Sequence, residues 1–399
     1  MTNAQWRTVA LEDVADLNPR LSEKLAATDQ VAFVPMAAVS AETASVTAEE
    51  SRTYAEVSKG YTSFLSGDVL LAKITPCFEN GKIAQAVLSK RVGFGSTEFH
   101  VIRPRADKLD GRYTHHFLRL DRVRLAGERR MTGSGGQRRV PENYLAKLEI
   151  PLPPLAEQRR IAEVLDRAEA LRAKRRAALD QLDALTQSLF LDLFGDPATN
   201  PKGWPLVQLG DQTTKIGSGS TPTGGETAYR AEGISLIRSL NVRDGEFTFK
   251  DLAHISDEQA SKLAGVIVEQ NDILLNITGA SVARVCRAPS SVLPARVNQH
   301  VCIIRPKPTL NAVFLEQFLL AEQTKRRLLR IGGAGATREA ITKAQIEVFE
   351  AICPPVLLQR EFARRVTAVE KLKTAQRASL AELDALFATL QHRAFRGEL

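Results

Sequence analysis

The chain contains two copies of one unit, and this internal repeat restricts the fold more than any other feature of the sequence. Pro154 and Gln158 return 201 residues later as Pro355 and Gln359, within stretches that match on both sides. Upstream, with small changes of offset, residues 67–71 return as 271–275 and residues 101–104 as 303–306. A period of about 200 residues is far longer than that of any solenoid, so the sequence predicts a duplicated domain.

Both units have the same internal order of elements. Short apolar runs separated by Gly, Pro and Ser are typical of strands, and in the first unit they cover residues 31–34, 68–73, 83–87 and 100–102. A short amphipathic helix over residues 113–125 follows, then a glycine-rich loop, a Pro-Pro pair and a long helix. We therefore expect an α+β fold with two globular domains in tandem repeat.

Each unit ends in a helix of about forty residues. Residues 155–194 contain neither Gly nor Pro, and steps of four and three residues trace an apolar stripe from Ile161 and again from Phe362. Forty residues at about 1.5 Å each reach roughly 60 Å, which exceeds one small domain. The pattern favours an antiparallel coiled coil of the two helices. The alternative is two unrelated amphipathic core helices.

Both stripes turn polar at their centres, where antiparallel pairing would bring together Arg172, Arg175, Lys373 and Gln376. Like charges at a seam repel, so we expect these long side chains to reach outward. Leu171 and Leu372 are expected to stay inside, and Glu169 and Glu370 to offset part of the repulsion. If the four polar positions face the seam, replacing them with Leu should raise stability.

These boundaries predict four segments. The first globular domain covers residues 1–152, and the central long helix covers 153–196. The second domain covers residues 197–353, and the C-terminal long helix covers 354–399.

Composition and motifs exclude several classes of protein. The net charge of +8 permits a polyanionic partner, and the four cysteines lack Cys-x-x-Cys spacing, so no zinc ribbon is indicated. The start of the chain has no apolar signal region and no window resembles a membrane span, so we expect a cytoplasmic protein. No phosphate-binding loop and no histidine spacing suited to a metal are present. The chain is predicted to be non-catalytic.

Positive charge is concentrated beside the glycine-rich loops. Arginine side chains next to exposed backbone amides suit phosphate oxygens, which supply affinity without sequence information. The alternative is a solvated basic helix face. The candidates for DNA contact in these regions are Arg129, Arg130, Ser134, Gln137, Arg138 and Arg139 in the first unit, and Arg326, Arg327 and Arg338 in the second.

Base reading needs side chains that both donate and accept hydrogen bonds, notably Asn, Gln and Arg. Such side chains gather at the ends of the apolar runs, where loops can present them, although Asn and Thr in turns are also common for structural reasons. The remaining DNA-binding candidates are Lys73, Thr75, Asn80 and Lys82 in the first unit, and Arg238, Asn241, Asn276, Thr278, Arg284, Asn298 and Gln299 in the second.

Several segments together resemble a known family, the specificity subunits of type I restriction–modification systems. Residues 150–161 (IPLPPLAEQRRI) resemble the family's junction between a target recognition domain and a conserved helix. The segments 67–82 and 93–99 resemble motifs of its first domain, and residues 219–222 with 234–238 resemble another domain subtype. The likeness covers essentially the whole chain. The second junction departs from the pattern, because residues 352–356 (ICPPV) lack the first proline.

This resemblance implies a non-catalytic DNA reader. Each domain would bind one half of a split double-stranded target, and the paired helices would set the spacer and dock two methyltransferase subunits that carry S-adenosylmethionine. A motor–nuclease subunit using ATP and magnesium would join for cleavage, and none of these cofactors is expected on this chain. One alternative is a structural adaptor with two protein-binding ends. The other is a fused methyltransferase, but this chain lacks the Asn-Pro-Pro-aromatic turn that such an enzyme would need.

Overall fold

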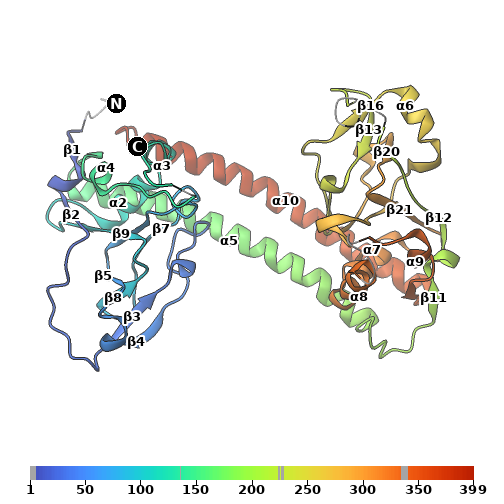
Figure 1. Cartoon of the computed structure of the whole chain (residues 1–399), viewed down its shortest axis with the longest axis horizontal. Coiled ribbons are helices and arrows are strands. Elements are labelled where there is room, and N and C mark those ends of the chain that lie inside the picture. Colours follow the sequence, from blue (N-terminus) through green and yellow to red (C-terminus); the bar gives the residue numbers. More distant parts are fainter. Residues whose placement is uncertain (1–5, 135, 223–224, 226–228, 334–339) are drawn as a thin grey trace. The chain divides into compact units, whose positions relative to one another are not determined.

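A computed structural model describes residues 6–134, 136–222, 225, 229–333 and 340–399. The chain divides into two compact units (Figure 1). Unit 1 comprises residues 1–177 and 377–399, and unit 2 comprises residues 178–376. Each unit therefore contains one globular domain and a segment of each long helix, which are α5 (Leu155–Phe194) and α10 (Val356–Ala394).

Unit 1 is built on two four-stranded sheets and one two-stranded sheet. The first sheet has the order β2-β9-β6-β7 and the second has the order β4-β3-β8-β5, in which β3 and β8 are parallel. β1 pairs with β10 just before the long helix. The strands are β1 (Thr8–Ala10), β2 (Ala15–Leu17), β3 (Gln30–Val34), β4 (Glu50–Thr53), β5 (Thr62–Leu65), β6 (Val69–Ala72), β7 (Ile83–Gln85), β8 (Val92–Gly95), β9 (Phe99–Pro104) and β10 (Glu149–Pro151).

Unit 2 repeats the topology of these three sheets and adds a two-stranded pair, β14-β15. Its sheets have the orders β12-β21-β18-β19 and β16-β13-β20-β17, the pair β13 and β20 is again parallel, and β11 pairs with β22. The duplication predicted from the sequence is confirmed. The strands are β11 (Leu206–Gln208), β12 (Thr213–Ser218), β13 (Ile234–Ile237), β14 (Val242–Arg243), β15 (Glu246–Phe247), β16 (Ala253–Ile255), β17 (Ile267–Val268), β18 (Ile273–Asn276), β19 (Val285–Arg287), β20 (Ala295–Val297), β21 (Val301–Pro306) and β22 (Glu350–Ile352).

Short helices cover the sheets, and one prediction about them is wrong. The segment expected as a single helix over residues 113–125 forms two helices, because the extended backbone of Leu120 separates them. Leu120 is buried in the core of unit 1, so packing overrides the helical pattern. The short helices are α1 (Tyr54–Val57), α2 (Gly111–Leu118), α3 (Asp121–Glu128), α4 (Glu142–Ala146), α6 (Asp257–Lys262), α7 (Ala312–Leu320), α8 (Glu322–Gly333) and α9 (Lys343–Glu347).

The repeated glutamines anchor each long helix to its domain. Gln158 is fully buried, its Nε2 donates to the carbonyls of Lys108 and Pro153, and its Oε1 accepts from the backbone N–H of Asp110. Gln359 makes the corresponding bonds in unit 2. The two junctions also agree in their backbone hydrogen bonds, despite the missing proline in the second.

Within each unit, segments of α5 and α10 pack antiparallel along the predicted stripe. In unit 1, Leu165 is fully buried in one core with Phe387. In unit 2, Phe190 and Phe194 contact Phe362 with ring centroids 5.7 and 5.2 Å apart. The predicted antiparallel coiled coil is confirmed. None of the described helices contains a stretch apolar enough to cross a bilayer.

The polar centre of the stripe differs from the expectation. Leu171 and Leu372 are 53% and 54% exposed, so the prediction that they stay inside is wrong. Arg172 and Lys373 point inward instead, with 14% and 10% of their side chains exposed. The reason is helical geometry: residues 172 and 373 continue the four-and-three steps of the seam, whereas their predecessors lie about 100° around the helix.

Inward placement is tolerated because acids surround each cation. In unit 1, Arg172 bonds Glu169 at 2.9 Å and Asp384 at 2.6 Å, and its guanidinium lies 4.4 Å from the Phe387 ring centre. In unit 2, Lys373 bonds Glu370 at 2.8 Å and Asp183 at 2.6 Å. The expected contribution of Glu169 and Glu370 is confirmed, and both ionic clusters repeat at the offset of 201.

Candidate nucleic-acid interface

Three segments of unit 1 meet at one end of the β2-β9-β6-β7 sheet. The glycine-rich segment folds back on itself, with Thr132 and Arg139 exchanging backbone hydrogen bonds of 3.0 and 2.8 Å. It is joined to the loop after β6, because the Val140 N–H donates to the Lys73 carbonyl at 2.9 Å. The N–H of Lys73 donates to the carbonyl of Glu98, in the turn between β8 and β9, at 2.8 Å. A continuous backbone frame therefore holds the three segments.

This frame brings together four of the candidate side chains, those of Lys73, Thr75, Arg138 and Arg139. The N–H of Thr75 donates to the Arg138 carbonyl at 2.9 Å, and its hydroxyl donates to Glu79 at 2.9 Å. The Arg138 guanidinium lies 3.7 Å from Glu79 and is 45% exposed. The loop after β6 and the glycine-rich segment thus form one surface.

Arg139 is held in place by an acid. Its guanidinium donates through Nε and one NH2 group to both carboxylate oxygens of Glu98 at 2.8–3.2 Å. The hydrogen bonds from Arg139 lower the pKa of Glu98, and they raise the pKa of Arg139 itself. Both groups are charged at neutral pH. Arg139 is 41% exposed, so a second anion can approach it from solvent.

The other candidates of unit 1 are distributed around this surface. Arg129, Ser134, Gln137 and Asn80 are exposed. Arg130 turns away, with its guanidinium 5.4 Å from the Tyr144 ring centre. Lys82 is half-buried, and its ammonium donates to the Met36 carbonyl at 3.0 Å.

Unit 2 contains the same backbone frame. The Ile341 N–H donates to the Ile277 carbonyl at 2.8 Å, and the Ile277 N–H donates to the His300 carbonyl at 3.0 Å. Thr278 bridges to Ala340, as Ile74 bridges to Arg139 in unit 1. The frame is thus a property of the repeated fold.

The side chains on the second frame differ from those on the first. A hydrogen-bonded chain links Thr221, Gln299, His300 and Thr278. The Thr221 hydroxyl donates to the Gln299 carbonyl oxygen, the Gln299 amide donates to Nε2 of His300 at 3.1 Å, and Nδ1 of His300 lies 2.5 Å from the Thr278 hydroxyl. In this arrangement the ring proton is on Nδ1 and donates to Thr278. Gln299 itself is exposed.

Three candidate asparagines of unit 2 are enclosed. Asn241 is fully buried, and its amide donates to the carbonyls of Thr248 and Lys250. Asn276 is fully buried and donates to the Ser239 carbonyl at 2.9 Å. Asn298 is 4% exposed and accepts from the His300 N–H at 3.0 Å. All three hold loop backbones in this structure.

The arginine candidates of unit 2 are more widely spread. Arg238 donates to the Asp251 carbonyl and lies 5.0 Å from the Tyr229 ring centre, while Arg284 is exposed. Arg326 pairs with Glu322, and Arg327 covers the Phe349 ring at 4.7 Å. Arg338 lies outside the described residues.

Sequence reasoning missed Glu98 as the residue that orients Arg139. No local pattern links positions 98 and 139, because the contact exists only through the tertiary frame. In the part of the chain that the structure describes, no three His, Cys, Asp or Glu side chains gather as a metal site would require.

Comparisons with known proteins agree with this arrangement. Residues 3–181 match the family model described as the type I restriction modification DNA specificity domain. The chain is 34% identical to the type I restriction enzyme EcoAI specificity subunit of Escherichia coli, over 68% of this chain and 61% of that protein. It is 36% identical to the EcoEI specificity subunit of Escherichia coli, over 47% of this chain and 32% of that protein. The chain thus spans less than two thirds of the length of these two relatives.

Two solved structures share the fold along nearly the whole chain. One is a chain from a study of complex assembly and conformational transition of the type I R-M system, with a TM-score of 0.58, 22% identity and 99% coverage of both chains. The other is a type I restriction-modification S subunit from M. genitalium, with a TM-score of 0.59, 14% identity, and coverage of 99% of this chain and 97% of that one. Over residues 3–181 the chain is thus similar to the type I restriction modification DNA specificity domains, and over nearly its whole length it shares the fold of the two solved structures.

Proposed function

We propose that this protein is the DNA-reading specificity subunit of a type I restriction–modification complex, and that each unit reads one half of a bipartite double-stranded target. The observation that carries the proposal is the repeated loop frame with different side chains. Unit 1 presents Arg138 and Arg139, whereas unit 2 presents Gln299 and the Thr278–His300 pair. The same frame with different donors and acceptors suits two half-sites of different sequence.

Within each unit the exposed and enclosed candidates have different roles in this proposal. Exposed Arg129 and Arg138 contact phosphates, and exposed Asn80 and Gln299 contact base edges. The enclosed asparagines 241, 276 and 298 support the loops that carry the readers. The reading therefore depends on loop shape as well as on residue type.

The long helices carry the partner interactions in this proposal. Four exposed leucines of the long helices form pairs at an offset of 201: Leu171 and Leu386 in unit 1, and Leu372 and Leu185 in unit 2, with 43–54% of each residue exposed. Exposed apolar side chains mark interaction surfaces where they form a patch. Their repetition at an offset of 201 fits two equivalent sites for two methyltransferase subunits, which carry S-adenosylmethionine. A motor–nuclease subunit with ATP and magnesium completes the complex, and this chain supplies no catalytic group.

The docking sites are tested by stoichiometry. Replacing Leu171 and Leu386 with Glu should reduce the number of bound methyltransferase subunits from two to one, measured by analytical ultracentrifugation. The matched replacement of Leu372 and Leu185 should do the same, and all four together should abolish binding. Binding of two subunits by both double variants would contradict this placement.

The reading of split targets is tested by exchanging residues 1–150 for the corresponding domain of another specificity subunit. Methylated adenines in host DNA should then change in one half of the recognised sequence only. A change in both halves would contradict independent reading. An unchanged methylation map would contradict DNA reading by unit 1.

A salt titration separates DNA reading from the adaptor alternative. Affinity that depends on several phosphate contacts falls steeply as salt rises, whereas apolar protein contacts do not. We expect the logarithm of the affinity for short duplex DNA to fall steeply with the logarithm of the salt concentration.

The helices set the spacer between the half-sites in this proposal. One heptad inserted into both α5 and α10 adds about 10 Å to the pair and should lengthen the methylated spacer. Insertion into one helix alone breaks the seam register and should prevent folding. An unchanged spacer after the paired insertion would show that the helices do not determine it.

A further inference from the structure

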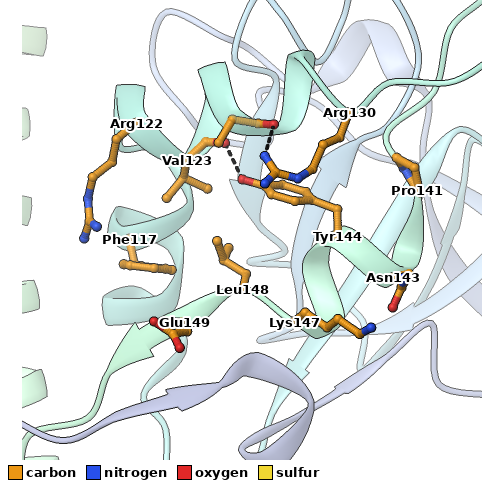
Figure 2. A pocket seen from close by; sticks show the side chains of 11 residues that line it. Phe117, Arg122, Val123, Arg130, Pro141, Asn143, Tyr144, Lys147, Leu148 and Glu149 are labelled. Atoms are coloured by element: carbon orange, nitrogen blue, oxygen red, sulfur yellow. Dashed lines mark hydrogen bonds between the residues drawn. The ribbon is translucent and has the colours of Figure 1, made fainter.

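A pocket of about 650 Å³ lies in unit 1 between α3, α4 and β10 (Figure 2). Its accessible apolar lining is contributed by the half-buried Ala126, Pro141, Tyr144 and Leu148, and the buried Phe117 and Val123 also border it. Three cations, those of Arg122, Arg130 and Lys147, line it as well, and all three residues are exposed. Glu149 is the one acidic residue of the lining. The pocket thus combines an apolar surface with a surplus of positive charge.

The three cations have no acidic partner among the residues that the structure describes. The Arg122 guanidinium lies 5.7 Å from the Phe117 ring centre. Arg130 donates to the Ala126 carbonyl at 3.0 Å and lies over Tyr144. The Tyr144 hydroxyl in turn donates to the Val123 carbonyl at 2.6 Å, which fixes the ring in the wall (Figure 2). The two guanidinium groups are therefore positioned by rings and, for Arg130, by a carbonyl, and they remain available to an external anion.

The corresponding surface of unit 2 is filled. Ala126 corresponds to Arg327 and Leu148 to Phe349, and the Arg327 guanidinium lies 4.7 Å from the Phe349 ring centre. The counterparts of Arg122, Arg130 and Lys147 in unit 2 are Gln323, Ile331 and Val348, which carry no charge. The three cations of the pocket are therefore specific to unit 1.

We propose that this pocket binds an acidic peptide segment with one bulky apolar side chain, contributed by a partner protein. The apolar side chain occupies the surface formed by Ala126, Tyr144 and Leu148, and neighbouring carboxylates pair with the three cations. A DNA backbone fits less well, because sugar and phosphate gain nothing from an apolar hollow. The groups that would orient a small ligand, the Tyr144 hydroxyl and the carbonyls of Val123 and Ala126, are already hydrogen-bonded.

The proposal goes beyond DNA reading and does not depend on it. The probe is a fluorescein-labelled pentapeptide, Glu-Asp-Phe-Asp-Glu, and binding to the full chain is measured by fluorescence anisotropy. Two matched peptides separate the contributions: one carries Ser in place of Phe, and the other carries the amides in place of the acids. We expect each matched peptide to bind at least ten-fold more weakly. No binding of the first peptide at millimolar protein, or equal binding of all three, would overturn the proposal.

Two variants test the location. Ala126→Arg copies the filling seen in unit 2, so it closes the hollow while adding positive charge. Leu125→Arg adds the same charge at a neighbouring position of α3 that is 45% exposed and does not line the pocket. We expect Ala126→Arg to weaken peptide binding at least ten-fold and Leu125→Arg to leave it unchanged or slightly tighter, with unfolding temperatures confirming that both variants fold.

The same titrations with a short duplex DNA distinguish the outcomes. If Ala126→Arg leaves peptide affinity unchanged, attraction is only electrostatic and the pocket proposal is wrong. If Ala126→Arg weakens DNA binding and spares the peptide, the pocket belongs to the DNA surface. Should Ala126→Arg fail to fold, Lys147→Glu replaces it, with an expected loss of at least five-fold for the acidic peptide and none for the amide peptide.

Discussion

Reversing the buried charge at position 373 should destabilise unit 2 through its ionic cluster. Lys373 has 10% of its side chain exposed and bonds Asp183 at 2.6 Å and Glu370 at 2.8 Å, which are themselves 58% and 38% exposed. Two opposite unit charges about 4 Å apart, at an effective dielectric constant of about 20, attract each other by about 4 kcal/mol. This value does not include the costs of desolvation and of lost side-chain entropy. Exposed partners reduce the net contribution to about 1 kcal/mol each.

Lys373→Glu replaces two such attractions with two repulsions of similar size. We therefore expect a loss of about 3–4 kcal/mol in the free energy of unfolding. Adding Asp183→Lys restores the attraction between positions 183 and 373, while the repulsion from Glu370 remains. The double variant should recover about half of the loss, with a coupling energy of roughly 2–4 kcal/mol between the two positions.

The assay follows denaturant unfolding by the fluorescence of Trp204, which lies in unit 2 and packs against its core. A Trp6→Phe background removes the other tryptophan of the chain. Lys371→Glu is the matched control, because this exposed position lies on the same helix and should change stability by less than about 0.5 kcal/mol. A coupling energy below about 0.5 kcal/mol would refute the reasoning and show that Lys373 is buried only to pack its aliphatic stem.

Four further predictions follow from the same contacts. Gln158→Leu leaves two carbonyls and one N–H unpaired and should destabilise unit 1 by about 3 kcal/mol in denaturant unfolding, with no shift in the unit 2 transition. Arg172→Leu removes the ion pairs with Glu169 and Asp384 and should lower the free energy of unfolding by about 1 kcal/mol, opposite to the expectation from sequence alone. A rise in the unfolding temperature of this variant would contradict the prediction. Burial lowers the pKa of Lys373, but its hydrogen bonds to Asp183 and Glu370 outweigh burial, so the pKa of Lys373 is raised. The stability difference between the wild type and Lys373→Met should therefore be constant around neutral pH and disappear as the pH rises above about 10.4. Replacing Arg138 and Arg139 with Ala should lower affinity equally for cognate and unrelated DNA and flatten the salt slope, whereas a loss confined to cognate DNA would assign them to base reading.

The sequence by itself determined the features that depend on repetition and on local pattern. The duplicated unit, the α+β class and the two long helices could be predicted because they are encoded in residue order, in β-branched runs and in forty residues without Gly or Pro. The antiparallel pairing followed from the equal registers of the two stripes. Such signals extend over many residues, so a single deviation, such as the break at the buried Leu120, does not reverse them.

Only the tertiary structure decided what each side chain at a polar position does. The four-and-three period places Arg172 on the seam and Leu171 beside it, but it does not show what makes a buried arginine tolerable there. That depends on acids such as Asp384, more than 200 residues away. Likewise, Arg139 is oriented by Glu98 through a backbone frame that joins three loops, and the enclosed Asn276 resembles an exposed reader in sequence. A charged or amide side chain is stabilised by whichever partner it meets, and those partners are brought together by contacts that are distant in the chain.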